Sequence, residues 1–163
     1  MIIPKQTLFV GKTIHHFESL PSTNDYATHL LSKSKPSEGT AISTYNQTKG
    51  KGQHDSIWES SANQNLTLSI LLQPIFLLPK HQFWLSQAIA LAVRDFVADF
   101  VINKKVFIKW SNDIYIENEK IAGILIQNII SGSTITNSII GIGININQNN
   151  FNFNNNTNNR KAT

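Results

Sequence analysis

The segment KIAGILIQNIISGSTITNSIIGIGININ, residues 120–147, decides the fold of this chain. Aliphatic and β-branched side chains fill two runs within it, at residues 121–130 and 134–146. The SGS sequence at residues 131–133, between the two runs, is typical of a turn. We therefore predict two long strands joined by a tight turn.

Outward from this segment, shorter runs also indicate strands. They lie around Phe9 and at residues 14–17, 40–45, 66–72, 106–110 and 114–116, with a hairpin turn at Glu117-Asn118-Glu119. Between residues 80 and 101 apolar side chains recur three or four positions apart, which predicts a core helix. A second helix is predicted after Pro21, with Ser22 as its capping residue. The pattern favours an α+β fold, a mixed and mostly antiparallel sheet with helices packed on one face.

The composition limits the class of protein. The 163 residues fit one domain, which we place at residues 1–148, followed by an Asn-rich tail at residues 149–163 that is too polar to pack and is predicted to be disordered. The absence of cysteine excludes disulfides, thiolate metal ligands and cysteine nucleophiles. The net charge of +4 favours anionic partners such as nucleotides, or is only a weakly basic surface.

Targeting and membrane segments are not indicated. The first residues lack a long apolar core behind a basic start, so they do not have the pattern of a secretory signal. The apolar run at residues 66–78 is too short to span a bilayer. We expect a cytoplasmic protein without a membrane partner.

A flexible loop is predicted at residues 46–57, which lack apolar periodicity. Within it, Gly50, Lys51 and Gly52 can bring backbone N–H groups and a cation to a phosphate or an adenylate. The glycine spacings of a Walker loop and of the dinucleotide fingerprint are absent. A mobile surface loop without a ligand explains the same residues.

A second polar segment is KWSND, residues 109–113, between two predicted strands. Its Lys109, Asn112 and Asp113 suit a phosphate, an amide and a metal-bound water respectively. The alternative is a β-turn with an Asx motif, with Trp110 in the core.

Glycines interrupt both of the long predicted strands. Gly123 follows Lys120 and marks either the close approach of a ligand or a bulge. Gly141 and Gly143 leave one face of their strand bare, either for a flat ligand or for close packing.

Backbone donors at the predicted helix start, Ser22-Thr23-Asn24, either receive a carboxylate or ureido oxygen or only cap the helix. The five histidines show no metal-ligand spacing, so we expect ordinary surface or core histidines and name no metal-ligating residues.

Taken in order, these segments resemble the biotin protein ligase family over residues 9–148. The family carries Ser-Thr-Asn at a helix start, a Gln before a glycine- and arginine-rich loop that ends in Trp, then Lys-Trp-Pro-Asn-Asp, Lys-x-x-Gly-Ile-Leu and Gly-x-Gly-x-Asn. The matching positions are residues 22–24, Gln47 with 50–58, 109–113, 120–125 and 141–145. The resemblance implies an ATP-dependent ligase that forms biotinyl-5'-AMP and transfers biotin to a lysine of a carrier protein such as that of acetyl-CoA carboxylase.

The resemblance also implies roles for the site residues. Lys120 would meet the activated carboxyl group and Lys109 would neutralise the phosphates, which makes these two lysines the catalytic candidates. Biotin would contact Ser22, Thr23, Asn24, Gln47, Gly50, Lys51, Lys120 and Gly123. The nucleotide would contact Lys51, Gln53, Trp58, Lys109, Asn112, Asp113 and Asn145. ATP and Mg²⁺ are the implied cofactors, and a biotin carrier protein is the implied partner.

Four positions depart from the family pattern. Lys51 stands where Arg is usual and, like Gln53, cannot bind a phosphate in the bidentate way of arginine. Gln53 stands where Arg is usual and loses bidentate phosphate recognition, and Asp55 stands where Gly is usual, so we expect weaker adenylate binding. Ser111 in place of Pro should be a mild change. Family members continue with more catalytic domain and a small β-barrel, which implies a C-terminal truncation. The motifs begin without a preceding winged helix-turn-helix, so we expect no DNA partner.

Other functions stay open at this point. A lipoate ligase or acyltransferase shares the implied fold, and a non-catalytic biotin-binding relative would carry the same motifs. A homodimer through an exposed sheet edge is possible.

Overall fold

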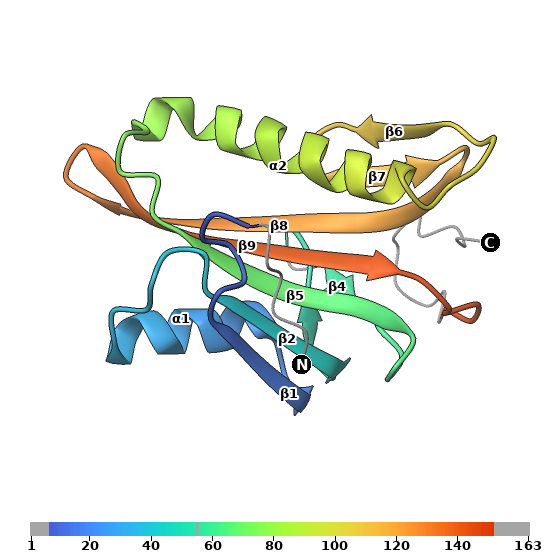
Figure 1. Ribbon diagram of the computed structural model, residues 1–163, viewed down its shortest axis with the longest axis horizontal. Helices are drawn as coiled ribbons and strands as arrows, with labels where there is room; N and C mark the ends of the chain where they lie inside the picture. Colours follow the sequence, from blue (N-terminus) through green and yellow to red (C-terminus); the bar gives the residue numbers. More distant parts are fainter. Residues whose placement is uncertain (1–6, 55, 152–163) are drawn as a thin grey trace.

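A seven-stranded sheet is the main feature of the computed structural model, which describes residues 7–54 and 56–151 (Figure 1). The strand order is β1-β2-β5-β9-β8-β7-β6. Strands β1 and β2 are parallel, and each other neighbouring pair in this order is antiparallel. The predicted mixed, mostly antiparallel sheet is therefore confirmed. In chain order the elements are β1 (Ile14–Leu20), α1 (Thr23–Lys33), β2 (Ala41–Gln47), β3 (Gly50–Lys51), β4 (Ile57–Trp58), β5 (Asn65–Leu72), the 3-10 helix η1 (Pro79–His81), α2 (Gln82–Ala98), β6 (Val106–Lys109), β7 (Asp113–Ile116), β8 (Glu119–Ser131) and β9 (Thr134–Asn145).

The predicted pair of long strands forms the centre of the sheet. Strands β8 and β9 pair antiparallel, and Gly132 in the turn between them has a φ of 59°. Side chains disfavour this left-handed conformation, so glycine suits the turn. Strand β9 also pairs with β5, from Ser138 to Asn145. The central strand is therefore hydrogen-bonded on both sides.

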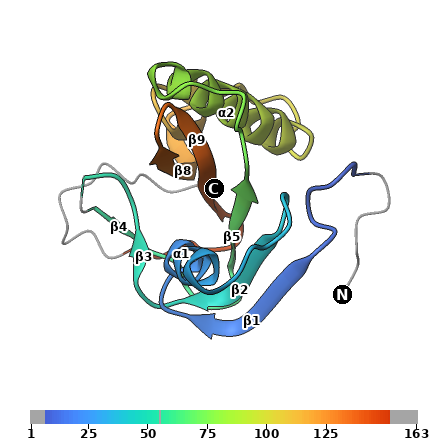
Figure 2. The same ribbon diagram turned by 90° about the vertical axis from the view of Figure 1, so that its left-hand side faces the viewer.

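The two helices pack on opposite faces of the sheet (Figures 1 and 2). Val93 of α2 belongs to the same core cluster as Ile144, whereas Ala27 of α1 belongs to a second cluster with Ile139. Both isoleucines lie on β9, and successive side chains of a strand alternate between faces, so these odd and even positions point to opposite sides. The helices thus do not share one face, as the sequence pattern led us to expect, because periodicity shows that a helix has an apolar side but not which sheet face it covers. Neither helix in the described part of the chain has the length and apolarity needed to cross a membrane.

The two ends of the described region, residues 7–13 and 146–151, contain no strand and contact the rest of the fold through hydrogen bonds. Residues 7–13 form bends and turns, so the strand predicted around Phe9 is wrong; the Gly11 N–H instead donates to Gly39 O at 2.8 Å. At the other end, Gln148 is buried and its side-chain oxygen accepts a hydrogen bond from Asn65. Most of the predicted tail, residues 152–163, lies outside the described residues.

The loop predicted at residues 46–57 contains a small hairpin. In it, Gly50 pairs with Trp58 and Lys51 pairs with Ile57, as strands β3 and β4. The sequence did not predict this strand pairing within the loop. Trp58, in the second strand of this hairpin, lies over strands β8 and β9 of the sheet.

Candidate functional site

The start of α1 and the strands beside it form a largely buried, uncharged polar surface. The backbone N–H of Thr23 donates to Gln47 Oε1 at 2.9 Å, and the Thr23 hydroxyl donates to the same oxygen at 3.3 Å. Ser69 on β5 donates to Thr23 Oγ1 at 2.8 Å, and Ser22 caps the helix with its side chain. Buried hydrogen bonds of this kind fix each polar group in place. We call Ser22, Thr23, Asn24 and Gln47 the neutral wall.

Asn24 joins the neutral wall to the central strands. Its amide nitrogen donates to Gln127 Oε1 at 2.9 Å, and its oxygen accepts from Ser69 at 2.6 Å. A Cβ atom on Gly141 would lie 2.4 Å from Asn24 Oδ1, so the approach requires glycine. Of the two explanations for the bare strand, close packing by a side chain is the one that holds at Gly141.

The indole of Trp58 covers the other two strand glycines. A Cβ atom would lie 2.3 Å from Trp58 Cε2 if built on Gly143, and 2.8 Å from Trp58 Cζ3 if built on Gly123. A Cβ on Gly50 would lie 2.3 Å from the Trp58 carbonyl oxygen, so this third glycine lets the hairpin close. Trp58 Nε1 is buried and has no hydrogen-bond partner among residues 7–54 and 56–151. The flat group that covers these two glycines is therefore the indole of Trp58 and not a ligand. Its N–H group remains available as a hydrogen-bond donor.

Lysines face the neutral wall from strands β6 and β8. Lys120 Nζ lies 2.8 Å from Asp113 Oδ1, and these side chains are 17% and 21% exposed. The same ammonium lies 5.6 Å from the centroid of the Trp58 ring, a cation–π contact. Lys109 Nζ lies 5.3 Å from the centroid of the Tyr115 ring. Aromatic faces and one carboxylate therefore orient the two predicted catalytic lysines.

Lys51 brings a third cation from the β3–β4 hairpin. Its Nζ lies 2.8 Å from Asp25 Oδ1 in the first turn of α1, and about half of each side chain is exposed. This ion pair joins the β3–β4 hairpin to α1, the helix that begins in the neutral wall. We call the four ionic side chains Lys51, Lys109, Asp113 and Lys120 the charged wall.

The turn of the KWSND segment is held against β8. Asn112 Nδ2 donates to Ile124 O at 3.0 Å, and Ile124 N donates to Asn112 O at 2.8 Å. The predicted turn is therefore confirmed. The prediction that Trp110 lies in the core is wrong. Its side chain is 56% exposed and lies against Phe83, with 4.3 Å between ring centroids.

A cavity of about 310 Å³ lies between the two walls. All eight residues of the neutral and charged walls line it, together with Gln53, Trp58, Asn112 and Gly123. Two predicted site residues are outside this lining: Gly50 lies behind the Trp58 backbone, and Asn145 is buried at the end of β9. The structure thus brings together segments that are far apart in the sequence.

Several supporting residues were given no role in the predicted site. Ser69 and Gln127 hold Asn24, and Leu125 and Tyr115 line the cavity. Ser69 could have been found, because a polar residue in an apolar strand needs a buried partner. The other three depend on which face of a strand points to the cavity, which the sequence does not decide.

The described residues contain no group of three or more His, Cys, Asp or Glu side chains placed to hold a metal ion. Asp113 is the acidic residue in the cavity lining. One carboxylate suits a Mg²⁺ ion whose other ligands are phosphate oxygens and water, rather than a cage made by the protein.

The same arrangement of sheet and helices occurs in solved biotin protein ligases, and this defines the class. The Aquifex aeolicus biotin protein ligase in complex with biotin and ATP is 28% identical with a TM-score of 0.70, over 87% of this chain and 56% of that one. The Helicobacter pylori biotin acetyl coenzyme A carboxylase synthetase with bound biotinylated ATP is 28% identical with a TM-score of 0.65, over 86% and 64%.

The chain belongs to the biotin/lipoate A/B protein ligase family, whose model matches residues 16–145. The bifunctional ligase/repressor BirA of Bacillus subtilis is 32% identical over 137 residues, which are 84% of this chain and 41% of that protein. The chain thus spans about two fifths of the length of this curated relative. The resemblance drawn from the five motifs is confirmed.

Proposed function

We propose that this chain is an ATP-dependent biotin ligase, which forms biotinyl-5'-AMP and transfers biotin to a lysine of a carrier protein such as that of acetyl-CoA carboxylase. The observation that carries the proposal is the meeting of a neutral wall and a charged wall in one cavity. Related proteins that are named biotin ligases and solved with biotin and ATP support the choice of substrates.

The neutral wall suits the uncharged head of biotin. A ureido group offers N–H donors and a carbonyl acceptor, and buried hydroxyl and amide groups can pair with it without burying a charge. Thr23 and Gln47 are the central contacts, with Ser22 and Asn24 beside them. Leu68 and Leu125 in the cavity lining would cover the apolar ring and side chain.

The charged wall suits the activation step. An oxygen of the biotin carboxylate attacks the α-phosphorus of ATP, the bond from that phosphorus to the bridging oxygen breaks, and pyrophosphate leaves. Two anions must approach each other, so fixed cations lower the barrier. Lys120 would meet the carboxyl group and Lys109 the phosphates, while Lys51 and Gln53 would hold the nucleotide from the hairpin side.

Nucleotide recognition would also use the Trp58 face and the KWSND turn. Trp58 has an unused indole N–H, and Asn112 lines the cavity beside Asp113. Asn145 lies two positions beyond Gly143 on the same face of β9, and its buried side-chain oxygen has no partner within the described ranges. An adenine amino group is a donor that would satisfy it.

Mg²⁺ would accompany ATP and neutralise its phosphate charge. Asp113 is the carboxylate that would hold it, and the residue fits because a single acid is enough when phosphates supply most ligands. The ion pair with Lys120 keeps that carboxylate beside the reacting groups.

Transfer completes the reaction. The neutral amine of the carrier lysine attacks the acyl carbon of the mixed anhydride, the bond from that carbon to the phosphate oxygen breaks, and AMP leaves as the amine loses a proton. The β3–β4 hairpin would slow hydrolysis by covering the adenylate until the carrier arrives. We propose that the domain which does this extends to Gln148, whose burial against Asn65 supports that boundary.

The test is to incubate the chain with ATP, Mg²⁺, a purified biotin carrier domain and either biotin or lipoate. We expect the carrier to gain the mass of one biotinyl group, and a carrier with its acceptor lysine changed to arginine to gain none. A mass gain with lipoate but not with biotin would assign the chain to the other branch of the family. Tight biotin binding without any mass gain would instead indicate a binding protein.

A further inference from the structure

The side-chain amide of Asn24 is held at both of its ends. Asn24 is 4% exposed, lines the cavity and lies against the bare face of Gly141. Its Nδ2 donates to Gln127 Oε1 at 2.9 Å, and Ser69 donates to its Oδ1 at 2.6 Å. Because the two ends of an amide differ in hydrogen bonding, these partners decide how Asn24 is oriented in the neutral wall.

Ser69 cannot fix this amide alone. Its hydroxyl has one hydrogen, yet it lies near two acceptors, Asn24 Oδ1 and, at 2.8 Å, Thr23 Oγ1. At the nitrogen end of the amide, the carbonyl oxygen of Leu125 is 3.5 Å away, which is longer than an ordinary hydrogen bond. Gln127 therefore makes the stronger contact at this end.

Gln127 needs to supply only an acceptor. A backbone carbonyl oxygen can accept but not donate, so the end of the Asn24 amide beside Leu125 has to be the nitrogen. The oxygen end then faces the Ser69 hydroxyl, which can donate. Gln127 must present its own oxygen to complete this arrangement, and a carboxylate oxygen would serve equally well.

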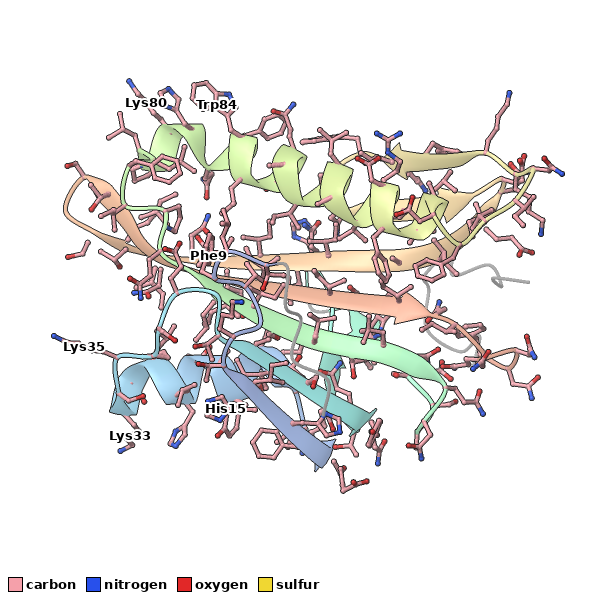
Figure 3. All side chains as sticks on the ribbon, viewed as in Figure 1. Phe9, His15, Lys33, Lys35, Lys80 and Trp84 are labelled. Carbon is pink, nitrogen blue, oxygen red and sulfur yellow. The ribbon has the colours of Figure 1, made fainter. Side chains whose placement is uncertain are left out.

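Gln127 acts from outside the cavity. Gly123 and Leu125 of β8 line the cavity, and Gln127 is the next residue on the same face of the strand, because side chains alternate along it. Gln127 itself is exposed and is not part of the lining. Its contact reaches Asn24 at the start of α1, whereas Lys33 at the other end of that helix projects away from the sheet (Figure 3). The contact thus joins the cavity end of the helix to a strand 103 positions away in the chain.

We propose that Gln127 is a positioning residue, which holds Asn24 against Gly141 and so fixes the shape of the neutral wall around the head of the ligand. This inference rests on the proposed function, in which that head is the ureido ring of biotin. Groups that contact a ligand bind it best when a surrounding layer of hydrogen bonds holds them in place. Gln127 would therefore affect how tightly biotin binds, and not the rate of the step at the lysines.

The first test is calorimetric binding of biotin to the whole chain. Gln127→Met removes the acceptor at similar length, and we expect it to raise the biotin Kd by about threefold to tenfold, the factor that corresponds to one neutral hydrogen bond. In steady-state kinetics it should raise KM for biotin and leave kcat unchanged. Gln127→Glu keeps an acceptor at this exposed position and should retain the wild-type Kd. Gln64→Met is the matched control, since Gln64 is exposed outside the cavity lining.

The second test observes the Asn24 amide without ligand or turnover. By NMR, the side-chain amide hydrogens of Asn24 should exchange with water faster in Gln127→Met than in the wild-type chain or in Gln64→Met. In an Asn24→Ala background, Gln127→Met should leave the biotin Kd unchanged, because the effect passes through Asn24.

An unchanged biotin Kd in Gln127→Met, or an equal rise in Gln64→Met, would overturn the positioning role. Biotin binding by the wild-type chain is the separate check on the proposed function. If the wild-type chain binds no biotin, the proposed function fails, and the positioning of Asn24 by Gln127 then stands or falls on the exchange rates.

Discussion

The two walls of the cavity differ in how they are built. Three of the four residues of the neutral wall are buried, with Thr23 and Ser22 no more than 4% exposed, and Gln47 is partly buried. The hydrogen bonds of this wall tie together α1, β2 and β5. The charged wall is partly open to water, and its lysines are oriented by aromatic rings and by ion pairs with Asp113 and Asp25.

This difference indicates that one wall serves ligand binding and the other serves the chemical step. Rigid, uncharged groups can recognise the shape and hydrogen-bonding pattern of a ligand that does not change during a reaction. Fixed cations matter most where charge is rearranged. We therefore expect changes in the charged wall to affect the rate of the reaction, and changes in the neutral wall to affect binding.

The largest effect is expected for Lys120→Ala. Loss of this cation should slow adenylate formation by about 10²–10³-fold, the range found for single groups that stabilise a transition state. The variant should also lose about 1–3 kcal/mol of stability, because Asp113 is left without its partner at a mostly buried site. Single-turnover formation of the adenylate, measured well below the unfolding temperature, checks the rate.

Lys104→Ala is the matched control for Lys120→Ala. It removes the same charge from an exposed position outside the cavity lining and should leave the rate unchanged. Equal rates for Lys120→Ala and the wild-type chain would remove Lys120 from the mechanism.

In the neutral wall, Thr23→Val should weaken biotin binding by about tenfold and leave kcat nearly unchanged, because it removes one hydroxyl from a binding surface without changing the charge near the reacting atoms. Steady-state kinetics with biotin as the varied substrate separates KM from kcat. Thr28→Val, on an exposed position of the same helix, is the control. A fall in kcat larger than the rise in KM would break the proposed division between the walls.

Where the walls meet, Gly143→Ala should destabilise the fold by about 1–3 kcal/mol, because the new methyl group overlaps the Trp58 indole. Chemical denaturation measures the loss. The same substitution in a Trp58→Ala background should cost much less, since neighbouring sites are not additive. Equal costs in both backgrounds would mean that Trp58 does not rest on Gly143.

The smallest effect is expected for Asp25→Asn. The Lys51–Asp25 ion pair is about half exposed, and such pairs contribute less than about 1 kcal/mol to stability. Thermal unfolding at low and high salt should show a small difference that salt removes. A loss as large as that of Gly143→Ala would show that the hairpin is anchored mainly by this pair.

The sequence was sufficient for most elements of the fold. Strong periodicity located α2, and dense β-branched runs located β8 and β9 with the turn at Gly132. It did not predict that the helices lie on opposite faces, because periodicity carries no information about which sheet face a helix covers. The β3–β4 hairpin was missed because two-residue strands have no periodicity to detect.

For the site, the motifs identified most of the cavity lining but not its internal packing. Gly123, Gly141 and Gly143 were recognised as unusual, yet only the structure shows Trp58 and Asn24 against them. Contacts of this kind join positions far apart in the chain, so no local pattern records them.

The central claim is that the two walls together activate biotin with ATP, and pyrophosphate release by this 163-residue chain tests it most directly. The assay compares ATP and Mg²⁺ with and without biotin, and includes Lys120→Ala and Lys104→Ala. We predict biotin-dependent release by the wild-type chain and by Lys104→Ala, and almost none by Lys120→Ala. Absence of biotin-dependent release from a folded wild-type chain that binds biotin would contradict the claim.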